Sequence, residues 1–89
     1  MAQIEIYTTP FCPFCHRAKA LLGKKGVAFQ EFDVMMDAQR RKEMESRSGG
    51  RGSVPQVFVD GVHLGDCNKL YDMEFDGTLD DALKIDSKS

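Results

Sequence analysis

Residues 3–25, QIEIYTTPFCPFCHRAKALLGKK, contain the signals that decide the fold. Polar and apolar residues alternate over residues 3–7, which predicts a short strand. A helix is predicted over residues 13–25, with Pro13 at its first position and Gly26 as its stop. Four apolar side chains of this helix share one face of a 3.6-residue period: Phe14, Ala18, Leu21 and Leu22. The stretch is therefore a strand, a loop and a helix, with two cysteines where the loop meets the helix.

The middle of the chain adds a strand, a helix and a hairpin. A second strand is predicted over residues 27–34, and a second helix over residues 37–47, capped by Asp37. A hairpin is predicted from residues 56–60 and 62–64, because the Asp-Gly pair at their junction is a strong signal for a two-residue turn.

Two further helices are predicted at the C-terminal end of the chain. Asp66 is expected to cap the first of them, which stops near Gly77. Thr78 and Asp81 resemble a capping box, and they predict the start of a short last helix. Residues 86–89 are expected to be a frayed tail.

The predicted order of elements, βαβαββαα, specifies an α/β fold with a mixed sheet. A βαβ unit requires parallel strands joined by a right-handed crossover, and the hairpin adds an antiparallel pair. A four-stranded mixed sheet flanked by helices on both faces follows from this order. Because 89 residues suffice for one modest core, a single domain over residues 1–89 is expected.

Composition and charge exclude several kinds of partner. The 14 acidic and 12 basic residues give a formal net charge of -2, so no nucleic-acid-binding face is expected. No stretch approaches the ~20 apolar residues that cross a bilayer, which excludes a membrane-spanning helix. Residues 1–5 lack the basic and apolar regions of a signal peptide. We therefore expect a cytoplasmic protein in a reducing compartment, without membrane contact.

The four residues Cys12-Pro13-Phe14-Cys15 predict a reactive thiol at the start of a helix. Cys12 is expected at the N-cap, where its sulfur meets the backbone N–H groups of Phe14 and Cys15 and the positive end of the helix dipole. Both effects favour the thiolate, which is the nucleophilic form of cysteine. Cys15 lies one turn deeper, so we expect it to be less exposed and to have a higher pKa. The motif therefore predicts that Cys12 attacks a disulfide and that Cys15 resolves the product.

The polar residues that follow the motif and the third cysteine are not expected to take part in the thiol chemistry. Arg17 and Lys19 are expected on a solvated helix face, and His16 is expected to be a surface residue rather than a general base. Cys67 is expected to be a small buried residue, with a third redox thiol as the alternative. A zinc half-site is the structural alternative for the C-x-x-C pair, but zinc takes four ligands and the sequence has no second paired motif.

Three separated motifs resemble those of the glutaredoxin family, namely C-P-F-C at residues 12–15, Val54-Pro55 and Gly65-Asp66-Cys67. The resemblance is to bacterial dithiol members, whose usual motif is C-P-Y-C, and it extends from Ile4 to about Leu83. It implies a thioredoxin fold and a cis peptide bond between Val54 and Pro55. It also implies that glutathione lies across six residues: Phe14, Arg41, Val54, Pro55, Cys67 and Asn68.

The chain departs from this family at positions that bear on glutathione. Phe14 stands where tyrosine is usual, and Thr9 stands where lysine is common. Asp66 replaces a glycine, and Lys69 stands where aspartate is common. These changes bear on the affinity for glutathione more than on the thiol chemistry.

The function that the resemblance implies is glutathione-dependent thiol–disulfide exchange. The expected substrates are protein–glutathione mixed disulfides and protein disulfides. Glutathione is the co-substrate, no cofactor is tightly bound, glutathione reductase takes part indirectly, and a monomer is expected. The alternative is a carrier of a [2Fe–2S] cluster bound through Cys12 and glutathione. A colourless monomer after anaerobic purification would exclude that alternative.

Overall fold

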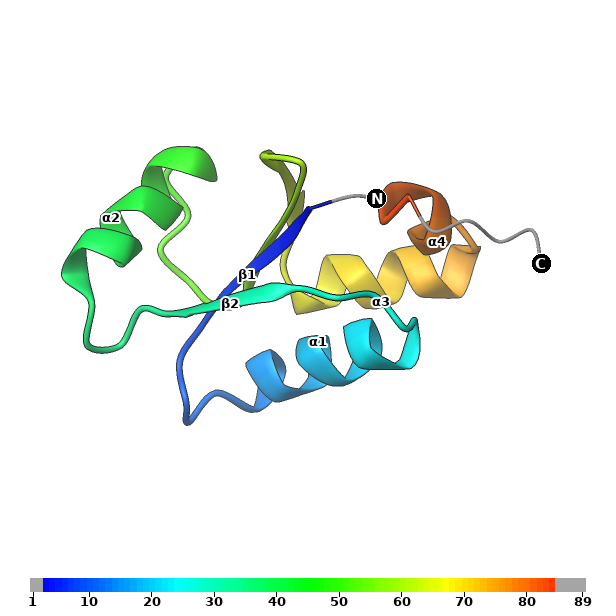
Figure 1. Ribbon diagram of the computed structural model, residues 1–89, viewed down its shortest axis with the longest axis horizontal. Helices are drawn as coiled ribbons and strands as arrows, with labels where there is room; N and C mark the ends of the chain where they lie inside the picture. Colours follow the sequence, from blue (N-terminus) through cyan, green and yellow to red (C-terminus); the bar gives the residue numbers. More distant parts are fainter. Residues whose placement is uncertain (1–2, 85–89) are drawn as a thin grey trace.

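The computed structural model describes residues 3–84 and confirms the predicted order βαβαββαα (Figure 1). The strands are β1 (Ile4–Thr8), β2 (Gln30–Asp33), β3 (Gln56–Val59) and β4 (Val62–Gly65). The helices are α1 (Pro13–Lys24), α2 (Ala38–Arg47), α3 (Cys67–Asp76) and α4 (Leu79–Ala82). Residues 86–89, predicted as a frayed tail, lie outside the described part of the chain.

The four strands form one mixed sheet in the order β2-β1-β3-β4, as predicted. Strand β1 pairs in parallel with β2 and antiparallel with β3, and β3 pairs antiparallel with β4. Because β1 and β2 are parallel, the connections that follow them leave the sheet at the same edge. Cys12 lies in the first of these connections, immediately before α1.

The helices cover both faces of the sheet (Figure 1). Helices α1, α3 and α4 pack on one face, over a core of apolar side chains from β1, β3, these helices and the C-cap of α4: Ile4, Ile6, Ala18, Leu21, Leu22, Val57, Val59, Cys67, Leu70, Leu79 and Leu83. Helix α2 covers the other face, where Met44 packs with Tyr7, Val34 and Phe58. The larger core therefore anchors α1, whose N-terminal end carries the two cysteines, Cys12 at the N-cap and Cys15 in the first turn.

The ends of the elements follow the predicted caps in two cases and differ in a third. Asp37 caps α2 by accepting the backbone N–H of Arg40 at 3.1 Å, and Asp66 caps α3 in the same way, as predicted. The predicted capping box at Thr78 is wrong. The backbone of Thr78 is helical rather than extended, and its hydroxyl donates to Asp76 at 2.6 Å instead.

The second strand is shorter than predicted. Pairing with β1 begins at Gln30, whereas the prediction began at residue 27. Val27 and Phe29 are partly buried against the larger core before the strand pairs, which explains their apolar character. No helix within residues 3–84 combines the length and the apolar character needed to span a membrane.

Candidate active site

Cys12 occupies the N-cap of α1, as predicted. Its backbone is extended, with φ -98° and ψ 113°, and Pro13 holds the first helical position. The backbone N–H of Cys15 donates a hydrogen bond to the Cys12 sulfur at 3.3 Å. The sulfur also lies 3.8 Å from the carbonyl oxygen of Val54, to which the thiol donates. Cys12 is half-buried, so its sulfur is held by the backbone and still reachable from solvent.

Cys15 lies one turn into the helix and is completely buried. Burial raises the pKa of the Cys15 thiol to about 12, and its contact with Cys12 adds to this rise. The predicted difference between the two thiols in depth is confirmed, as is the raised pKa of Cys15. At neutral pH Cys15 is therefore a protonated thiol beneath the more accessible Cys12.

The polar side chains that follow the cysteines are engaged elsewhere. His16 has its ring nitrogen 3.1 Å from the carbonyl oxygen of Pro10, and Lys19 forms an ion pair with Glu31 at 2.9 Å. Arg17 lies over the ring of Tyr71. None of these three contacts directs a basic group at the Cys12 sulfur.

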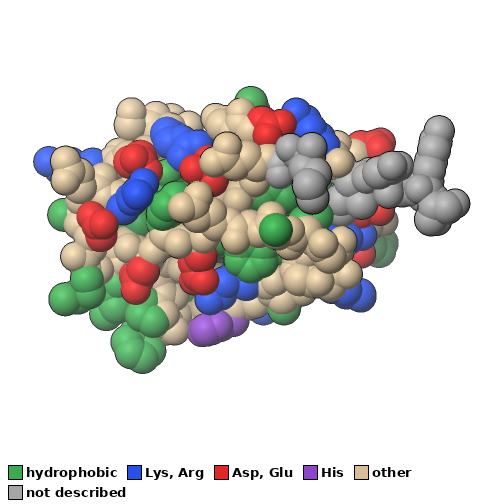
Figure 2. All heavy atoms as spheres, in the orientation of Figure 1, with side chains coloured by type: hydrophobic (Ala, Val, Ile, Leu, Met, Phe, Trp, Pro, Cys, Tyr) green, Lys and Arg blue, Asp and Glu red, His purple; other side chains and the backbone are tan. Residues whose placement is uncertain are grey.

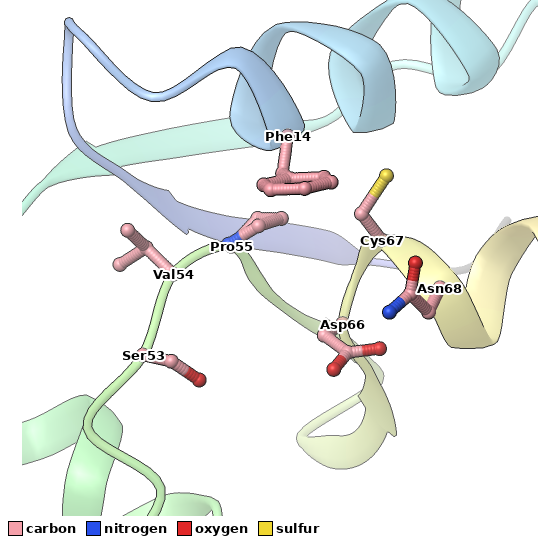
Figure 3. A pocket seen from close by; sticks show the side chains of 7 residues that line it. All are labelled: Phe14, Ser53, Val54, Pro55, Asp66, Cys67 and Asn68. Carbon is pink, nitrogen blue, oxygen red and sulfur yellow. The ribbon is translucent and has the colours of Figure 1, made fainter.

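A groove of about 160 Å³ opens beside Phe14, between the two cysteines of the C-P-F-C motif in the sequence (Figure 3). Seven residues line it: Phe14, Ser53, Val54, Pro55, Asp66, Cys67 and Asn68. Figure 3 shows Phe14 facing Pro55, with Asp66 and Asn68 at the start of α3. The peptide bond between Val54 and Pro55 is cis, as predicted. Three segments that are distant in the sequence thus meet around one cavity next to Cys12.

The structure brings together five of the six residues predicted to contact glutathione. Phe14, which is half exposed, and the other four line the groove. Arg41 does not line it. Its guanidinium donates to the carbonyl oxygen of Gly52 at 2.7 Å, next to the Ser53 end of the groove. Cys67 is buried, as predicted, and burial raises the pKa of its thiol.

Asp66 gives the groove a carboxylate that the sequence-based list of contacts did not include. It accepts the backbone N–H of Lys69 at 3.0 Å and lies 3.4 Å from the guanidinium of Arg51. The hydrogen bond from Lys69, supported by Arg51, holds the pKa of this carboxyl below its usual range. The aliphatic part of the Lys69 side chain lies over Gly65, and a Cβ atom at position 65 would come within 2.6 Å of the Lys69 Cγ. Asp66 is therefore an anion in the groove.

Gln56 is a second residue that the sequence-based prediction missed. It is completely buried directly after Pro55, in a strand whose other residues are apolar. Its amide nitrogen donates to the backbone carbonyl of Ser53 at 3.0 Å and lies 3.3 Å from the Ser53 hydroxyl. Its amide oxygen lies 2.6 Å from the ring of His63. A lone polar residue in an apolar strand was the signal that could have identified it.

Comparisons with known proteins agree in fold and in sequence. The family model described as Glutaredoxin matches residues 4–64. Glutaredoxin 3 of Escherichia coli (strain K12) is 54% identical over 84 residues, which cover 94% of this chain and 100% of that protein. The solution structure of glutaredoxin from Brucella melitensis has a TM-score of 0.81 and 49% identity, covering 94% of this chain and 90% of that chain.

A more distant structure supports the fold alone. The crystal structure of a buckwheat glutaredoxin–glutathione complex has a TM-score of 0.82 and covers 93% of this chain and 77% of that chain. Because its sequence identity is only 23%, the comparison supports the arrangement of strands and helices and nothing beyond it.

Proposed function

Because the chain belongs to the glutaredoxin family, its chemistry is thiol–disulfide exchange, and we propose that it reduces glutathione mixed disulfides with Cys12 as the nucleophile. The observation that carries this proposal is the position of the Cys12 sulfur. It sits at the start of α1, accepts the Cys15 N–H, and lies 3.8 Å from the carbonyl oxygen of Val54, a residue that lines the groove. Thiolates at helix N-termini are the reactive form in such exchanges.

The proposed cycle begins with a protein–glutathione disulfide. The Cys12 thiolate attacks the glutathione sulfur, the disulfide bond breaks, and the protein sulfur leaves and takes up a proton. A disulfide between Cys12 and glutathione remains. A second glutathione thiolate attacks the glutathione sulfur of that disulfide, which regenerates the Cys12 thiolate and releases glutathione disulfide. Glutathione reductase then restores the glutathione.

Protein disulfides follow the same first step and a different second one. Cys12 forms a mixed disulfide with one protein sulfur, and Cys15 loses its proton and attacks the Cys12 sulfur. The protein leaves as a dithiol, and Cys12 and Cys15 are left as a disulfide. Because the pKa of Cys15 is about 12 in the reduced form, Cys15 is a thiol at neutral pH. This supports free glutathione as the faster resolving group for glutathione mixed disulfides.

The groove offers complementary chemistry for glutathione. We propose that the backbone of Val54 pairs with the cysteinyl part, as an extended peptide pairs with a strand edge. The N-terminus of α3 at Cys67 and Asn68 would receive the γ-glutamyl end, with its carboxylate at the helix N–H groups and its ammonium toward the Asp66 carboxylate. Phe14 would cover the ligand with its exposed ring. Arg41 would meet the glycyl carboxylate after exchanging its contact with Gly52.

The test is reduction of the mixed disulfide between glutathione and 2-mercaptoethanol, coupled to NADPH oxidation through glutathione reductase. Cys12→Ser should lower the rate by at least ~10³-fold, because it removes the nucleophile. Cys15→Ser should keep most of the activity, because glutathione resolves the intermediate. Equal losses in both variants would contradict the proposed cycle.

A further inference from the structure

Three large apolar side chains are exposed at one end of the molecule. Phe11 is 82% exposed, Met35 is 50% exposed and Met36 is 89% exposed. Phe11 lies in the connection between β1 and α1, and the two methionines lie in the connection between β2 and α2. Exposed apolar groups that gather in one place mark contact sites more often than those scattered singly.

The topology of the sheet brings these side chains together. In the parallel pair of β1 and β2, Thr8 lies opposite Asp33, and the backbone N–H of Val34 bonds to the carbonyl of Thr8 at 2.9 Å. The two segments then leave the sheet at the same edge. They reach Phe11 and Met35 within three residues of the paired positions Thr8 and Asp33. Figure 2 shows hydrophobic side chains gathered at the end of the molecule where these two connections lie. We name Phe11, Met35 and Met36 the Phe-Met surface.

Two carboxylates flank the methionines of this surface. Asp33 accepts the backbone N–H of Met35 at 2.8 Å, and Asp37 accepts that of Arg40 at 3.1 Å as the cap of α2. Both residues are exposed, and neither has an ion-pair partner among residues 3–84. The apolar surface therefore has an acidic border, which complements a basic partner.

The Phe-Met surface adjoins the candidate active site through Phe11. Phe11 directly precedes Cys12, and the Cys12 sulfur contacts Val54 at the glutathione groove. A protein–glutathione disulfide bound at Cys12 has two halves that must leave the sulfur in different directions. The groove accommodates one half, and the Phe-Met surface is the neighbouring apolar surface on the Phe11 side of Cys12.

We propose that the Phe-Met surface docks the polypeptide that flanks the disulfide-bonded cysteine of a protein substrate. The fitting segment is extended, carries apolar side chains, and has Lys or Arg placed to meet Asp33 and Asp37. Methionine side chains suit this role because they are flexible and polarisable, and they can pack against different apolar partners. This inference rests on the proposed function and adds a protein-specificity surface to it.

The activity test compares two glutathionylated peptides of equal length with the small mixed disulfide. One peptide carries apolar and basic residues around the modified cysteine, and the other carries serine and glutamate there. The double substitution Met35→Ser with Met36→Ser should lower kcat/KM for the apolar basic peptide about tenfold, which corresponds to about 1.4 kcal/mol. It should leave the small substrate within about twofold. Both methionines are exposed, so their replacement leaves the core intact.

A matched control is available on the same chain. Phe75 is 95% exposed and lies on α3, outside the Phe-Met surface. Phe75→Ser removes an exposed apolar side chain that is larger than either methionine alone. It should leave kcat/KM unchanged for the two peptides and for the small mixed disulfide. If Phe75→Ser lowers the peptide rate as much as the double methionine variant, the effect is non-specific and the docking surface is refuted.

A binding measurement separates this inference from the redox chemistry. The apolar basic peptide, synthesised with serine in place of cysteine and a fluorescent label, is titrated with reduced protein. Its Kd should rise at least about fivefold for the double methionine variant and for Asp33→Asn with Asp37→Asn. Asparagine also caps helices, so α2 should persist in the second variant. Equal Kd values in wild type and both variants would overturn the docking proposal, whatever the activity assay shows. If the wild-type protein did not reduce the mixed disulfide between glutathione and 2-mercaptoethanol, the proposed function itself would be contradicted.

Discussion

At the scale of single residues, the contrast between Cys12 and Cys15 comes from their places on one helix. Cys12 is the N-cap and meets a backbone donor, whereas Cys15 is packed inside the first turn. Burial in an apolar environment disfavours the thiolate of Cys15 and raises its pKa, whereas the Cys12 sulfur is only half-buried. The division of labour in the proposed cycle therefore follows from position rather than from any extra catalytic side chain.

Gln56 bonds to Ser53, which lines the groove, and its effect on substrate binding can be measured separately from the chemistry at Cys12. Gln56→Met removes the amide that holds Ser53 and replaces it with an apolar side chain of similar length. Losing about 1 kcal/mol of hydrogen bonding at this loop should raise KM for the small mixed disulfide about fivefold. The turnover number should change much less, because Cys12 is untouched.

The control for this substitution is a measurement of stability. If Gln56 acts only in the core, Gln56→Met should change the urea midpoint and leave KM at the wild-type value. A role in positioning Ser53 shifts KM in the way described above. Gln56→Glu, which keeps an acceptor for His63 but loses the donor to Ser53, should raise KM as well.

The sequence sufficed for the residues whose environment is local. The N-cap position of Cys12 and the burial of Cys15 depend on residues three positions apart, so spacing alone predicted them. Gln56 and Asp66 depend on contacts made across the sheet and the groove. Such contacts need the register of β3 and β4, which the sequence does not specify. The role of Gln56 was therefore missed. Asp66 was predicted as the cap of α3 and as a departure that bears on glutathione, but its contact with Arg51 was not predicted.

At the scale of elements, α2 is held to the sheet largely by polar contacts. Within Ala38–Arg47, Met44 is the one fully buried residue. The Tyr7 hydroxyl donates to Glu43 at 2.5 Å and accepts from Arg47 at 2.6 Å, and Arg47 also pairs with Glu5 at 2.7 Å. The helix itself was predicted from its cap. Its partners on β1, Tyr7 and Glu5, lie about 40 positions away in the sequence, and these contacts were not predicted.

Tyr7→Phe tests how much this network contributes. The substitution removes one hydroxyl from a completely buried ring and leaves Glu43 and Arg47 without their shared partner. We expect a loss of ~1–2 kcal/mol in the free energy of unfolding at pH 7, measured by urea denaturation. Tyr71→Phe is the matched control, because its hydroxyl makes an exposed bond to Arg17, and it should change stability by less than ~0.5 kcal/mol.

The same network gives stability a dependence on acid. The hydrogen bond from Tyr7, helped by Arg40, lowers the pKa of Glu43 below its usual value. A carboxyl with a lowered folded-state pKa contributes stability above its unfolded pKa, near 4.3, and the contribution is lost as pH falls through the folded value. Tyr7→Phe should therefore reduce the drop in stability between pH 7 and pH 3. A drop as steep as in wild type would show that Glu43 is not linked to Tyr7.

At the scale of the whole molecule, the order β2-β1-β3-β4 assembles the site from segments that are far apart in the chain. The connection after β1 holds Cys12, the connection into β3 holds Val54 and Pro55, and the first residue of α3 is Cys67. The βαβ unit and the hairpin made this sheet predictable. The groove was predicted through the family resemblance, whereas the Phe-Met surface became visible only once β1 and β2 were placed side by side.

The reactivity of Cys12 is tested by locating the glutathione adduct that forms when the Cys15→Ser protein is mixed with glutathione disulfide. Without Cys15 the mixed disulfide cannot be resolved internally, so it should accumulate. Mass spectrometry of the intact protein at pH 7 should show one glutathione per chain, and peptide mapping should place it on Cys12. An adduct on Cys67, or an unmodified Cys12 under these conditions, would contradict the claim that Cys12 is the reactive thiol.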